Sequence, residues 1–410
     1  MLLIGVLLAK MEVPLATIGI YESTLFLSGI CTFFWVSGIL NSTLSVYPNK
    51  SEKEKKSFLF NIGIILTILS IITTVAAGAY LFLTKQNMVA DESIKFAIII
   101  YILINTPTYF NEYYLLLTEQ KNRLITYGVI GFLINVAVVI VPIYLTGKIL
   151  YSIYGLILFS ALKLILFAGI IARNTIHQID KPQIILFLKS ASPLIISILI
   201  SGSADYIDSW LVVTYFGQEK FALFRYGAKE LPLSLILANS MSTAMIPILS
   251  SGRNIKDNFG QLIKESKLLM NWLFPATIIL LVSSKLLYPL IFSESFSESS
   301  RIFNIYLLLI ISRMIFPQSI MMALNAKQEI FHTAILEIII NITASYLLML
   351  KFGIQGIAYG TVIAFFTEKL ILAFLLKSKG IDIQEYTPFR LWAGYSTLMV
   401  ITYILVENFL

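Results

Sequence analysis

The chain has very few of the residues that make metal centres, disulfides and acid–base active sites. One of its 410 residues is cysteine, two are histidine and 13% are charged, whereas soluble proteins have about 25% charged residues. The single Cys31 excludes a disulfide framework and a four-thiolate metal site. His177 and His332 fall at expected loop ends, and neither belongs to a metal-ligand or Ser-His-Asp pattern. We therefore expect no cofactor, no metal ion and no enzymatic activity.

The sequence also has no Gly-rich phosphate loop and no expected loop longer than about 17 residues. An ATP-driven pump would need a nucleotide-binding domain, and a membrane-bound glycan polymerase or ligase would need a large outer loop for its catalytic residues. The net charge of +7 is spread over many short loops, whereas nucleic-acid binding requires a basic face. The sequence therefore disfavours an ATP-driven pump, a membrane-bound glycan polymerase or ligase, and a nucleic-acid-binding protein. We expect no nucleic-acid partner.

Apolar residues dominate the chain, because 58% are hydrophobic and the mean hydropathy is +0.84. Long apolar runs match the roughly 20 helical residues that cross a bilayer core of about 30 Å, whereas barrel strands would be short and alternating. The sequence predicts a helical integral membrane protein. Twelve complete crossings are expected near residues 17–46, 57–83, 96–117, 124–146, 152–172, 190–214, 220–247, 268–292, 302–323, 330–350, 356–376 and 389–407.

The first residues form an apolar stub that is too short to span. Met1 to Ala9 end at Lys10 and look like the second half of a further helix. We expect the chain to begin inside its first helix, which brings the total to an odd thirteen.

Orientation follows from the basic residues of the loops, because Lys and Arg in short loops stay on the cytoplasmic side. One alternate set of loops holds 17 basic residues and the other holds eight. The richer set is therefore expected inside, and the N-terminal stub runs outward.

Residues 121–166 recur weakly but without a gap at 327–372. Lys121 and Lys327, the pair Ile134-Asn135 and Ile340-Asn341, and the tetrapeptides that begin at Lys163 and Lys369 are each 206 residues apart. Identities among Leu and Ile arise easily by chance, so the shared register and the intramembrane lysine carry the argument. An internal repeat of membrane helices is typical of a transporter whose substrate path lies between two lobes.

The expected fold is therefore an all-α integral membrane protein with two parallel six-helix lobes and one extra C-terminal helix. The lobes cover residues 1–185 and 186–378, and the extra helix lies in 379–410. Because six helices per half is an even number, both halves face the same way. The lobes should then be related by a pseudo-two-fold axis along the membrane normal.

Charged residues inside the expected spans are the functional candidates, because an ionised side chain near mid-bilayer costs a few kcal/mol at least and faces a wet cavity or a partner. The basic ones are Lys163, Arg225, Lys229, Arg313 and Lys369. The acidic ones are Glu112, Asp205, Asp208, Glu230, Glu337 and Glu368.

Two of these groups fall on consecutive spans that are expected to turn back at Gly217. Asp208 and Arg225 lie at equal distances from this glycine, and so do Asp205 and Lys229. One interpretation is two structural salt bridges that neutralise the four charges and bind nothing. The other is that the pairing is partial and that the cations line a cavity where an anionic headgroup competes for them.

Arg313 is expected near the middle of its span and is the best single candidate for an anion contact, because a guanidinium offers a planar fork of donors to phosphate. The alternative is a pair with Glu337 or Glu368. Lys163 has no acidic neighbour along its helix, although Glu112 can meet it across the lobe. Lys369 directly follows Glu368, so the two residues point about 100° apart on a helix and only one faces a cavity squarely.

Several segments resemble polysaccharide flippases of the multidrug/oligosaccharidyl-lipid/polysaccharide exporter superfamily. They are Phe187-Leu-Lys-Ser-Ala-Ser-Pro193, Asp205-Tyr-Ile-Asp208 through Phe216-Gly217, Phe221-Ala-Leu-Phe-Arg-Tyr226, Ala244-Met-Ile-Pro247, and near the start Pro14-Leu-Ala-Thr-Ile-Gly-Ile-Tyr21 and Tyr47-Pro48. The resemblance covers nearly the whole chain, but the motifs are soft. The half-missing first helix and the odd helix count depart from the family pattern and put function in doubt.

The resemblance implies two six-helix lobes, alternating access, and a central cationic cavity for an undecaprenyl-diphosphate-linked oligosaccharide. Asp208 matches the acidic position of the family's seventh helix. The expected function is a flippase of the bacterial inner membrane that moves this lipid-linked oligosaccharide to the outer leaflet. Its expected partners are the substrate's diphosphate headgroup, membrane lipids, and the glycan polymerase and glycosyltransferases of the same pathway.

The main alternative is an ion-coupled exporter of small amphipathic cations, from the drug-efflux branch of the same superfamily. Such an exporter needs a cavity dominated by carboxylates. The N-terminal half offers only Glu112 and Glu22 at depth, which favours the flippase.

Overall fold

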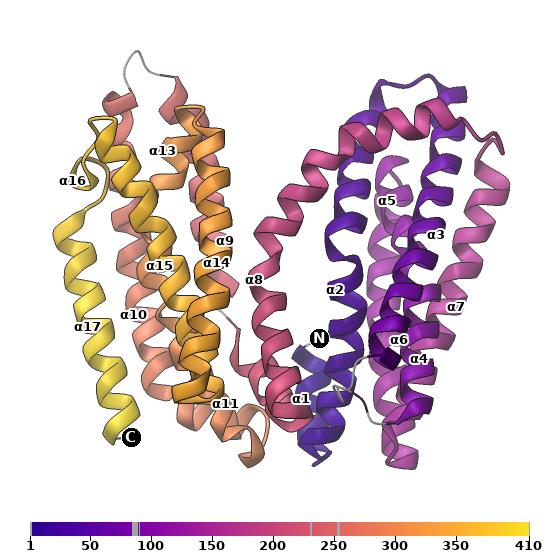
Figure 1. Ribbon diagram of the computed structural model, residues 1–410, viewed down its shortest axis with the longest axis horizontal. Coiled ribbons are helices and arrows are strands. Elements are labelled where there is room, and N and C mark those ends of the chain that lie inside the picture. Colours follow the sequence, from indigo (N-terminus) through magenta and orange to yellow (C-terminus); the bar gives the residue numbers. More distant parts are fainter. Residues whose placement is uncertain (1, 84–88, 90, 230–231, 252–254, 410) are drawn as a thin grey trace. The chain divides into compact units, whose positions relative to one another are not determined.

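The structure is a computed structural model that describes residues 2–83, 89, 91–229, 232–251 and 255–409. Within these ranges every regular element is a helix, as Figure 1 shows. Contacts between Cα atoms group the chain into two units, Met1–Tyr206 with Val213–Phe221, and Ile207–Val212 with Ala222–Leu410. We call them unit 1 and unit 2.

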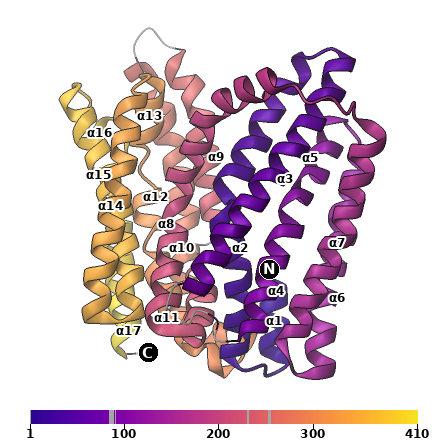
Figure 2. The ribbon, with the colours of Figure 1, turned by 45° about the vertical axis from the view of Figure 1, so that its right-hand side comes forward.

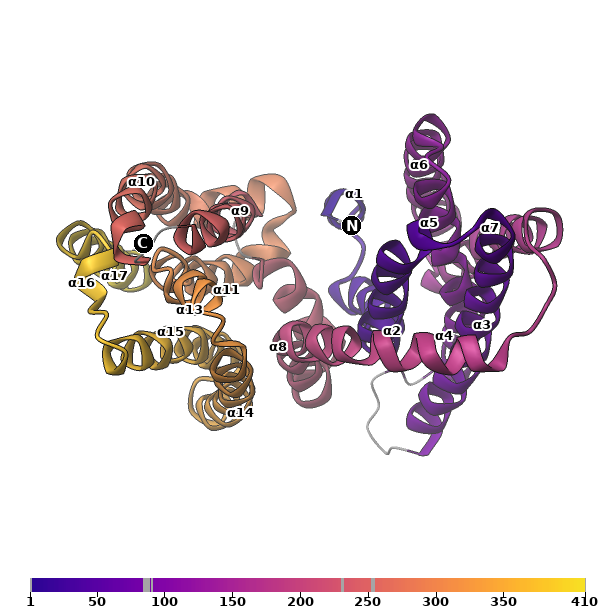
Figure 3. The ribbon, with the colours of Figure 1, turned by 90° about the horizontal axis from the view of Figure 1, so that it is seen from above.

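Unit 1 begins with the short helix α1 and is built mostly from long helices. Its elements are α1 (Leu2–Lys10), α2 (Leu15–Val46), η1 (Tyr47–Asn49), α3 (Glu52–Leu83), α4 (Glu92–Asn105), η2 (Thr106–Tyr109), α5 (Phe110–Leu117), α6 (Lys121–Thr146), α7 (Ile149–Asn174) and most of α8 (Lys181–Gly227). The helices α6 and α7 lie side by side, as Figure 2 shows. The first turns of α8 cross the ends of the unit 1 helices (Figure 3), and Phe187 and Ala191 join Phe58 and Trp35 in a buried apolar cluster.

Unit 2 contains the remaining helices. They are α9 (Pro232–Ser250), η3 (Ile255–Asn258), α10 (Phe259–Ile291), η4 (Glu294–Phe296), α11 (Ser297–Leu307), α12 (Ile310–Arg313), α13 (Pro317–Ala323), α14 (Lys327–Phe352), α15 (Ile354–Ser378), α16 (Ile383–Tyr386) and α17 (Phe389–Phe409). The last of these, α17, is the extra C-terminal helix that the sequence predicts, and it packs against α10.

Ten helices of the described residues are long and apolar enough to cross a membrane, or eleven if one bent pair counts as a single span. The chain is a multi-pass membrane protein, as predicted. The count is lower than the twelve predicted crossings partly because α8 joins two helices across a kink at Gly217, where the backbone angles are non-helical and where the sequence predicted the end of the span 190–214 and a turn into the next one. The span 302–323 is the bent pair, with an angle of 42° at its break.

The predicted span 220–247 is interrupted. Helix α8 ends at Gly227 and α9 starts at Pro232. Proline is favoured in the first turn of a helix, where its missing N–H costs nothing, so a new helix starts there. Glu230, one of the acidic candidates, lies outside the described residues.

The backbone carries the same turn at both copies of the sequence repeat. Glu119 and Asn325, which are 206 residues apart, both have a positive φ, 55° and 58°. The N–H of Gln120 donates to the Leu115 carbonyl at 2.9 Å, and the N–H of Ala326 donates to the Met321 carbonyl at 2.9 Å. The helices that follow, α6 and α14, both have 26 residues. Each then ends at a glycine with positive φ, Gly147 and Gly353. The repeated sequence therefore forms a repeated local structure.

A break before this turn is also repeated. In unit 1 the one-turn 3₁₀ helix η2 separates α4 from α5, and in unit 2 non-helical residues separate α12 from α13. Pro107 lies inside the first break and Pro317 directly follows the second. Proline has no N–H to donate and its ring clashes with the preceding turn, so regular α-helix is interrupted at both places, and the unit 2 span bends there by 42°.

Helix α15 packs against α14 through two small residues, Gly356 and Gly360. A Cβ atom added to Gly356 would lie 2.1 Å from the Leu348 carbonyl oxygen, and one added to Gly360 would lie 2.4 Å from the Ser345 backbone. Small residues spaced four apart let membrane helices approach closely. The contact of the two backbones depends on the absence of these side chains.

We predict opposite effects for the same substitution at two glycines. Gly356→Ala should lower the stability by about 2 kcal/mol, because the added methyl overpacks the α14 interface. Gly169→Ala in α7 has open space around its Cβ and should be neutral or stabilising by up to about 1 kcal/mol. Thermal unfolding of the purified protein in detergent measures both, and equal effects would contradict the proposed close packing.

Candidate functional site

A small polar cavity in unit 2 lies next to the broken span. It has a volume of about 40 Å³ and is lined by Arg313 and Lys369, with Asn239, Ser242 and Gln318 among the other polar residues. Two of the five predicted cations therefore share one cavity. Asn239 and Ser242 come from α9, Arg313 from the end of α12, Gln318 from α13 and Lys369 from α15.

The positive charge of Lys369 is compensated by a carboxylate of the same helix. Its Nζ lies 2.8 Å from Glu368 Oε2 and donates a hydrogen bond to Gln318 Oε1 at 3.2 Å. Lys369 is 8% exposed and Glu368 is 9% exposed. Lys369 lines the cavity and Glu368 is not among its lining residues, in line with the expectation that only one of these neighbours faces it, although the two long side chains reach each other. The pair is neutral, which reduces the cost of its burial.

Arg313 is placed by the helix break rather than by the middle of a continuous span. It is the last residue of the four-residue α12, it is half-buried, and its guanidinium carbon lies 4.9 Å from the centroid of the Phe365 ring. Glu337, which is 9% exposed, is within electrostatic range of Arg313, Lys369, Glu368 and Asp208. The charges of unit 2 therefore form one mixed cluster.

Unit 1 has a related arrangement around Lys163. Its Nζ donates to Asn105 Oδ1 at 2.8 Å, and Ser160 Oγ donates to the same oxygen at 3.2 Å. The ammonium lies 5.1 Å from the centroid of the Phe159 ring. Glu112 is exposed and interacts with Lys163 only through electrostatics. The nearest described partner of Lys163 is therefore an amide rather than the predicted carboxylate.

The two arrangements occupy equivalent places in the repeat. Lys163 and Lys369 are 206 residues apart, and so are the aromatic residues Phe159 and Phe365. Each lysine lies beside the broken helix of its unit, where it meets Asn105 directly before η2 or Gln318 at the start of α13. Each unit therefore holds a lysine bound to an amide at a helix break, and the aromatic ring of the repeat contacts Lys163 in unit 1 and Arg313 in unit 2.

Asp208 lies in a second polar cluster of unit 2. It is 1% exposed, and its Oδ2 accepts from Tyr306 Oη at 3.0 Å and from Thr361 Oγ1. Ser345 Oγ donates to Oδ1 at 3.4 Å, and Asn341 Nδ2 donates to Thr361 Oγ1 at 3.2 Å. The carboxylate is therefore surrounded by hydroxyl groups from α11, α14 and α15.

Hydroxyl oxygens are among the groups that contact the Asp208 carboxylate, and oxygen is the ligand type that hard cations prefer. Among the described residues no group of three or more His, Cys, Asp or Glu residues forms a metal site. The predicted pairing of Asp208 with Arg225, and of Asp205 with Lys229, stays a prediction. Asp205 is exposed, whereas Arg225 and Lys229 are half-buried.

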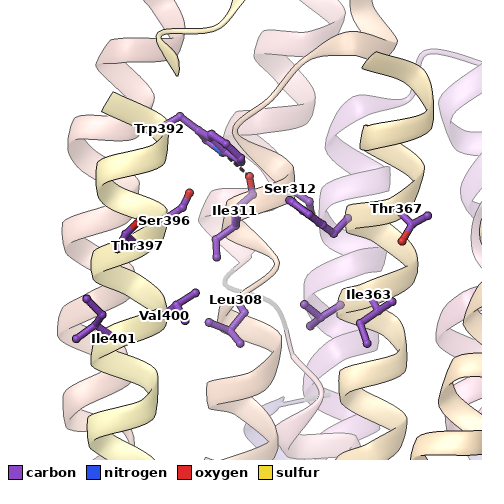
Figure 4. A pocket seen from close by; sticks show the side chains of 12 residues that line it. Leu308, Ile311, Ser312, Ile363, Thr367, Trp392, Ser396, Thr397, Val400 and Ile401 are labelled. Atoms are coloured by element: carbon purple, nitrogen blue, oxygen red, sulfur yellow. Dashed lines mark hydrogen bonds between the residues drawn. The ribbon is translucent and has the colours of Figure 1, made fainter. Parts of the chain in front are cut away.

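An apolar groove of about 520 Å³ lies in unit 2 between α12, α15 and α17. Figure 4 shows Trp392 and Val400 from α17 on one side and Ile363 and Thr367 from α15 on the other. Trp392 Nε1 donates to the Ile311 carbonyl at 2.8 Å. The lining of this groove is mostly apolar.

The sequence missed several of these polar residues. Asn105, Gln318, Tyr306 and Thr361 were not among the candidates. The first two had a signal, because each lies within two residues of a proline in an apolar run. Tyr306 and Thr361 gave no such signal, since only the tertiary structure brings them to Asp208.

We predict that Asp208 contributes more to stability than Asp205 does. Asp208→Asn turns an acceptor of several hydroxyl donors into a group with its own N–H donors, and it should cost about 2 kcal/mol. Asp205→Asn, the same change at an exposed position of the same helix, should shift stability by less than about 0.5 kcal/mol. Thermal unfolding measures both, and an unchanged Asp208→Asn would show that the hydroxyl contacts do not stabilise the fold.

Comparison with known proteins gives a match in fold. No family model matches the chain, and no curated protein matches its sequence. Among solved structures it resembles the lipid II flippase MurJ in an inward closed conformation, with a TM-score of 0.71 at 18% identity over 100% of this chain and 90% of the other. It also resembles an inward-facing multidrug-resistance transporter of the MATE family, with a TM-score of 0.61 at 15% identity over 92% and 93%. A transporter of the MOP superfamily from Pyrococcus furiosus, whose binding pocket is described as reversed in polarity, gives a TM-score of 0.51 at 14% identity over 89% and 87%. The chain has the fold of the MOP superfamily, the multidrug/oligosaccharidyl-lipid/polysaccharide exporters, as the resemblance in the sequence led us to expect.

Proposed function

We propose that this protein is a flippase that moves a lipid carrying a diphosphate-linked oligosaccharide from the cytoplasmic to the outer leaflet of a bacterial inner membrane. The observation that carries the proposal is the polar cavity at the break of the unit 2 span, where Arg313 and Lys369 lie together. Breaks at membrane depth are tolerated only where protein or a cavity satisfies the backbone, and substrate sites of transporters lie at such breaks.

The donors of this cavity suit a phosphorylated sugar. Arg313 presents a planar fork for phosphate oxygens, and charge-assisted hydrogen bonds to phosphate are stronger than neutral ones. Asn239, Ser242 and Gln318 add amide and hydroxyl groups of the kind that bind sugar hydroxyls. Lys369 enters the site as half of an ion pair with Glu368, so a diphosphate competes with a carboxylate for it.

The described cavity is too small for the whole headgroup. Its volume of about 40 Å³ compares with about 30 Å³ for a single water in the liquid. Substrate entry therefore requires the segment around the α12–α13 break to move. Short helices on either side of a break can shift without unfolding a long helix, which suits a site that opens and closes during transport.

The apolar groove beside α17 favours a substrate with a long hydrocarbon part. Its walls are mostly apolar, and they include Ile311 and Ser312, which lie two residues and one residue before Arg313. A polyprenyl chain in this groove would place its diphosphate near the guanidinium. A small soluble cation has no long apolar part that could occupy such a groove.

The other predicted cations have supporting roles in this proposal. Lys163 is the unit 1 counterpart of Lys369, and Arg225 and Lys229 follow the break at Gly217. We propose that they contact the diphosphate at other stages of an alternating-access cycle. The predicted charge partners fall into two groups. Asp208, Glu337 and Glu368 offset the positive charges of unit 2, whereas Asp205 and Glu112 are exposed acidic residues of unit 1. The expected glycan polymerase and glycosyltransferases remain part of this proposal.

A second candidate function is the ion-coupled export of small amphipathic cations. The observation in its favour is the pair of buried carboxylates Asp208 and Glu337 within electrostatic range of each other. In this case a proton or cation at Asp208 would exchange against the drug. Export of a fluorescent cationic dye that depends on Asp208 but not on Arg313 would favour this alternative.

We predict that Arg313→Gln lowers the rate of flipping by at least about tenfold, because the fork of charge-assisted hydrogen bonds to phosphate is lost. Arg313→Lys should keep part of the rate, since it retains the charge without the fork. The measurement is the transfer of a lipid-linked oligosaccharide across the bilayer of proteoliposomes.

The matched control is Arg390→Gln. This arginine is exposed in the first turn of α17 and does not line the cavity. Its flipping rate should equal that of the wild type, and all variants should insert into the membrane to the same level. A normal rate for Arg313→Gln would refute the assignment of the site.

A further inference from the structure

A groove in unit 1 has features that the proposed transport function does not use. It lies between α5, α6 and α7 and has a volume of about 410 Å³. Its walls are mostly apolar, with Leu115 from α5 and Leu166 and Ile170 from α7. Asn111 and Tyr127 lie deeper in the groove, and Arg123 lies at its mouth.

The mouth of the groove is basic. Arg123 is exposed, its Nη1 donates to Gln120 Oε1 at 2.7 Å, and it also lines an open hollow with Lys121 and Glu119 at the start of α6. The N-terminus of a helix favours anions through its unpaired N–H groups and its dipole. Glu119 is the acid of this hollow, and it is within electrostatic range of Lys55. The hollow therefore has a net positive charge beside a helix N-terminus.

The floor of the groove contains an unsatisfied acceptor. Asn111 is 1% exposed, and its Nδ2 donates to the Lys163 carbonyl at 2.9 Å, which fixes the orientation of the amide. Its Oδ1 is buried and has no hydrogen-bond partner among the described residues. A buried acceptor without a partner lowers the stability of the fold, so a hydrogen-bond donor from a bound molecule would be favourable at this oxygen. Tyr127 Oη, 3.5 Å from Nδ2, adds a second polar group at this depth.

The polar groups are spaced to suit the phosphate and the alcohol of one lipid headgroup. Tyr127 follows Arg123 by one helical turn, which is about 6 Å along α6. An anionic group held at the mouth would therefore have polar partners about one turn below it and apolar walls beside them. The glycerol backbone of a diacyl phospholipid has no free hydroxyl, so the donor at this depth is a headgroup alcohol that folds back from the phosphate into the groove.

We propose that this groove binds an anionic, hydroxyl-bearing phospholipid of the leaflet that α6 enters, with phosphatidylglycerol as the simplest example. Its phosphate contacts Arg123 and the N-terminus of α6. One acyl chain follows Leu115, Leu166 and Ile170, and a headgroup hydroxyl donates to Asn111 Oδ1. The lipid stabilises the packing of α5, α6 and α7, and it is a structural ligand rather than the transported substrate.

The equivalent turn of unit 2 does not have these residues. The position 206 residues after Arg123 is Glu329, which forms an ion pair with Lys379 at 3.1 Å. The counterpart of Asn111 is Pro317, which has no side-chain acceptor. The chain therefore repeats the turn in both units but builds the anion site only in unit 1.

Native mass spectrometry of the purified full chain tests this proposal without any transport assay. The protein is equilibrated with equal amounts of phosphatidylglycerol and phosphatidylcholine, and the ratio of the two lipids in the first bound position is measured. The wild type should prefer phosphatidylglycerol. Arg123→Ala should lower this preference about tenfold, because a charge-assisted contact to phosphate is lost.

The control is Arg173→Ala, which removes another exposed arginine from the same unit, at the end of α7, outside the groove. Its preference should remain that of the wild type. An equal loss in both variants would reduce the effect to general attraction of lipids to basic residues, and an unchanged Arg123→Ala would overturn the proposal. Phosphatidic acid, which lacks a headgroup alcohol, should bind the wild type several-fold more weakly than phosphatidylglycerol, and equal binding would remove the role of Asn111.

Discussion

In a bilayer every backbone N–H and C=O needs a partner within the protein, and the interruptions of regular α-helix at η2 and between α12 and α13 are where this requirement is hardest to meet. Pro107 leaves the Leu103 carbonyl without its helical donor, and Ser70 Oγ donates to that oxygen at 3.0 Å. At the unit 2 break the Ile311 carbonyl receives the indole N–H of Trp392 at 2.8 Å. Side chains from neighbouring helices thus make each break possible, and the candidate sites are built on these breaks.

The cost of charge inside the membrane explains how the cations are held. Lys369 has a carboxylate beside it, whereas Lys163 has an amide and an aromatic ring. An ammonium group whose direct contacts are neutral keeps more of its attraction for an external anion than one that is paired with a carboxylate. Arg313 combines a ring contact with a position at the end of a short helix, where a small movement of the backbone changes what its guanidinium can reach.

Much of the fold could be predicted from particular residues. Pro107 and Pro317 at the helix breaks, Gly217 at the break in α8, and the positive-φ Gly147 and Gly353 are local signals, because the conformation depends on the residue itself. The interruption of the predicted span 220–247 between α8 and α9 was missed. Hydropathy measures how apolar a segment is and not where a helix ends.

The sequence by itself determined the class of protein, most of the spans, and the 206-residue register that the backbone turns repeat. These depend on hydrophobicity and on local steric preference, which each segment carries alone. Only the tertiary structure decided which polar groups meet. Asp208 receives hydroxyls that lie 98, 137 and 153 residues away in the chain, and Lys163 reaches an amide 58 residues away. Such partners depend on how the helices pack and rotate, and charge or spacing along the chain does not encode this.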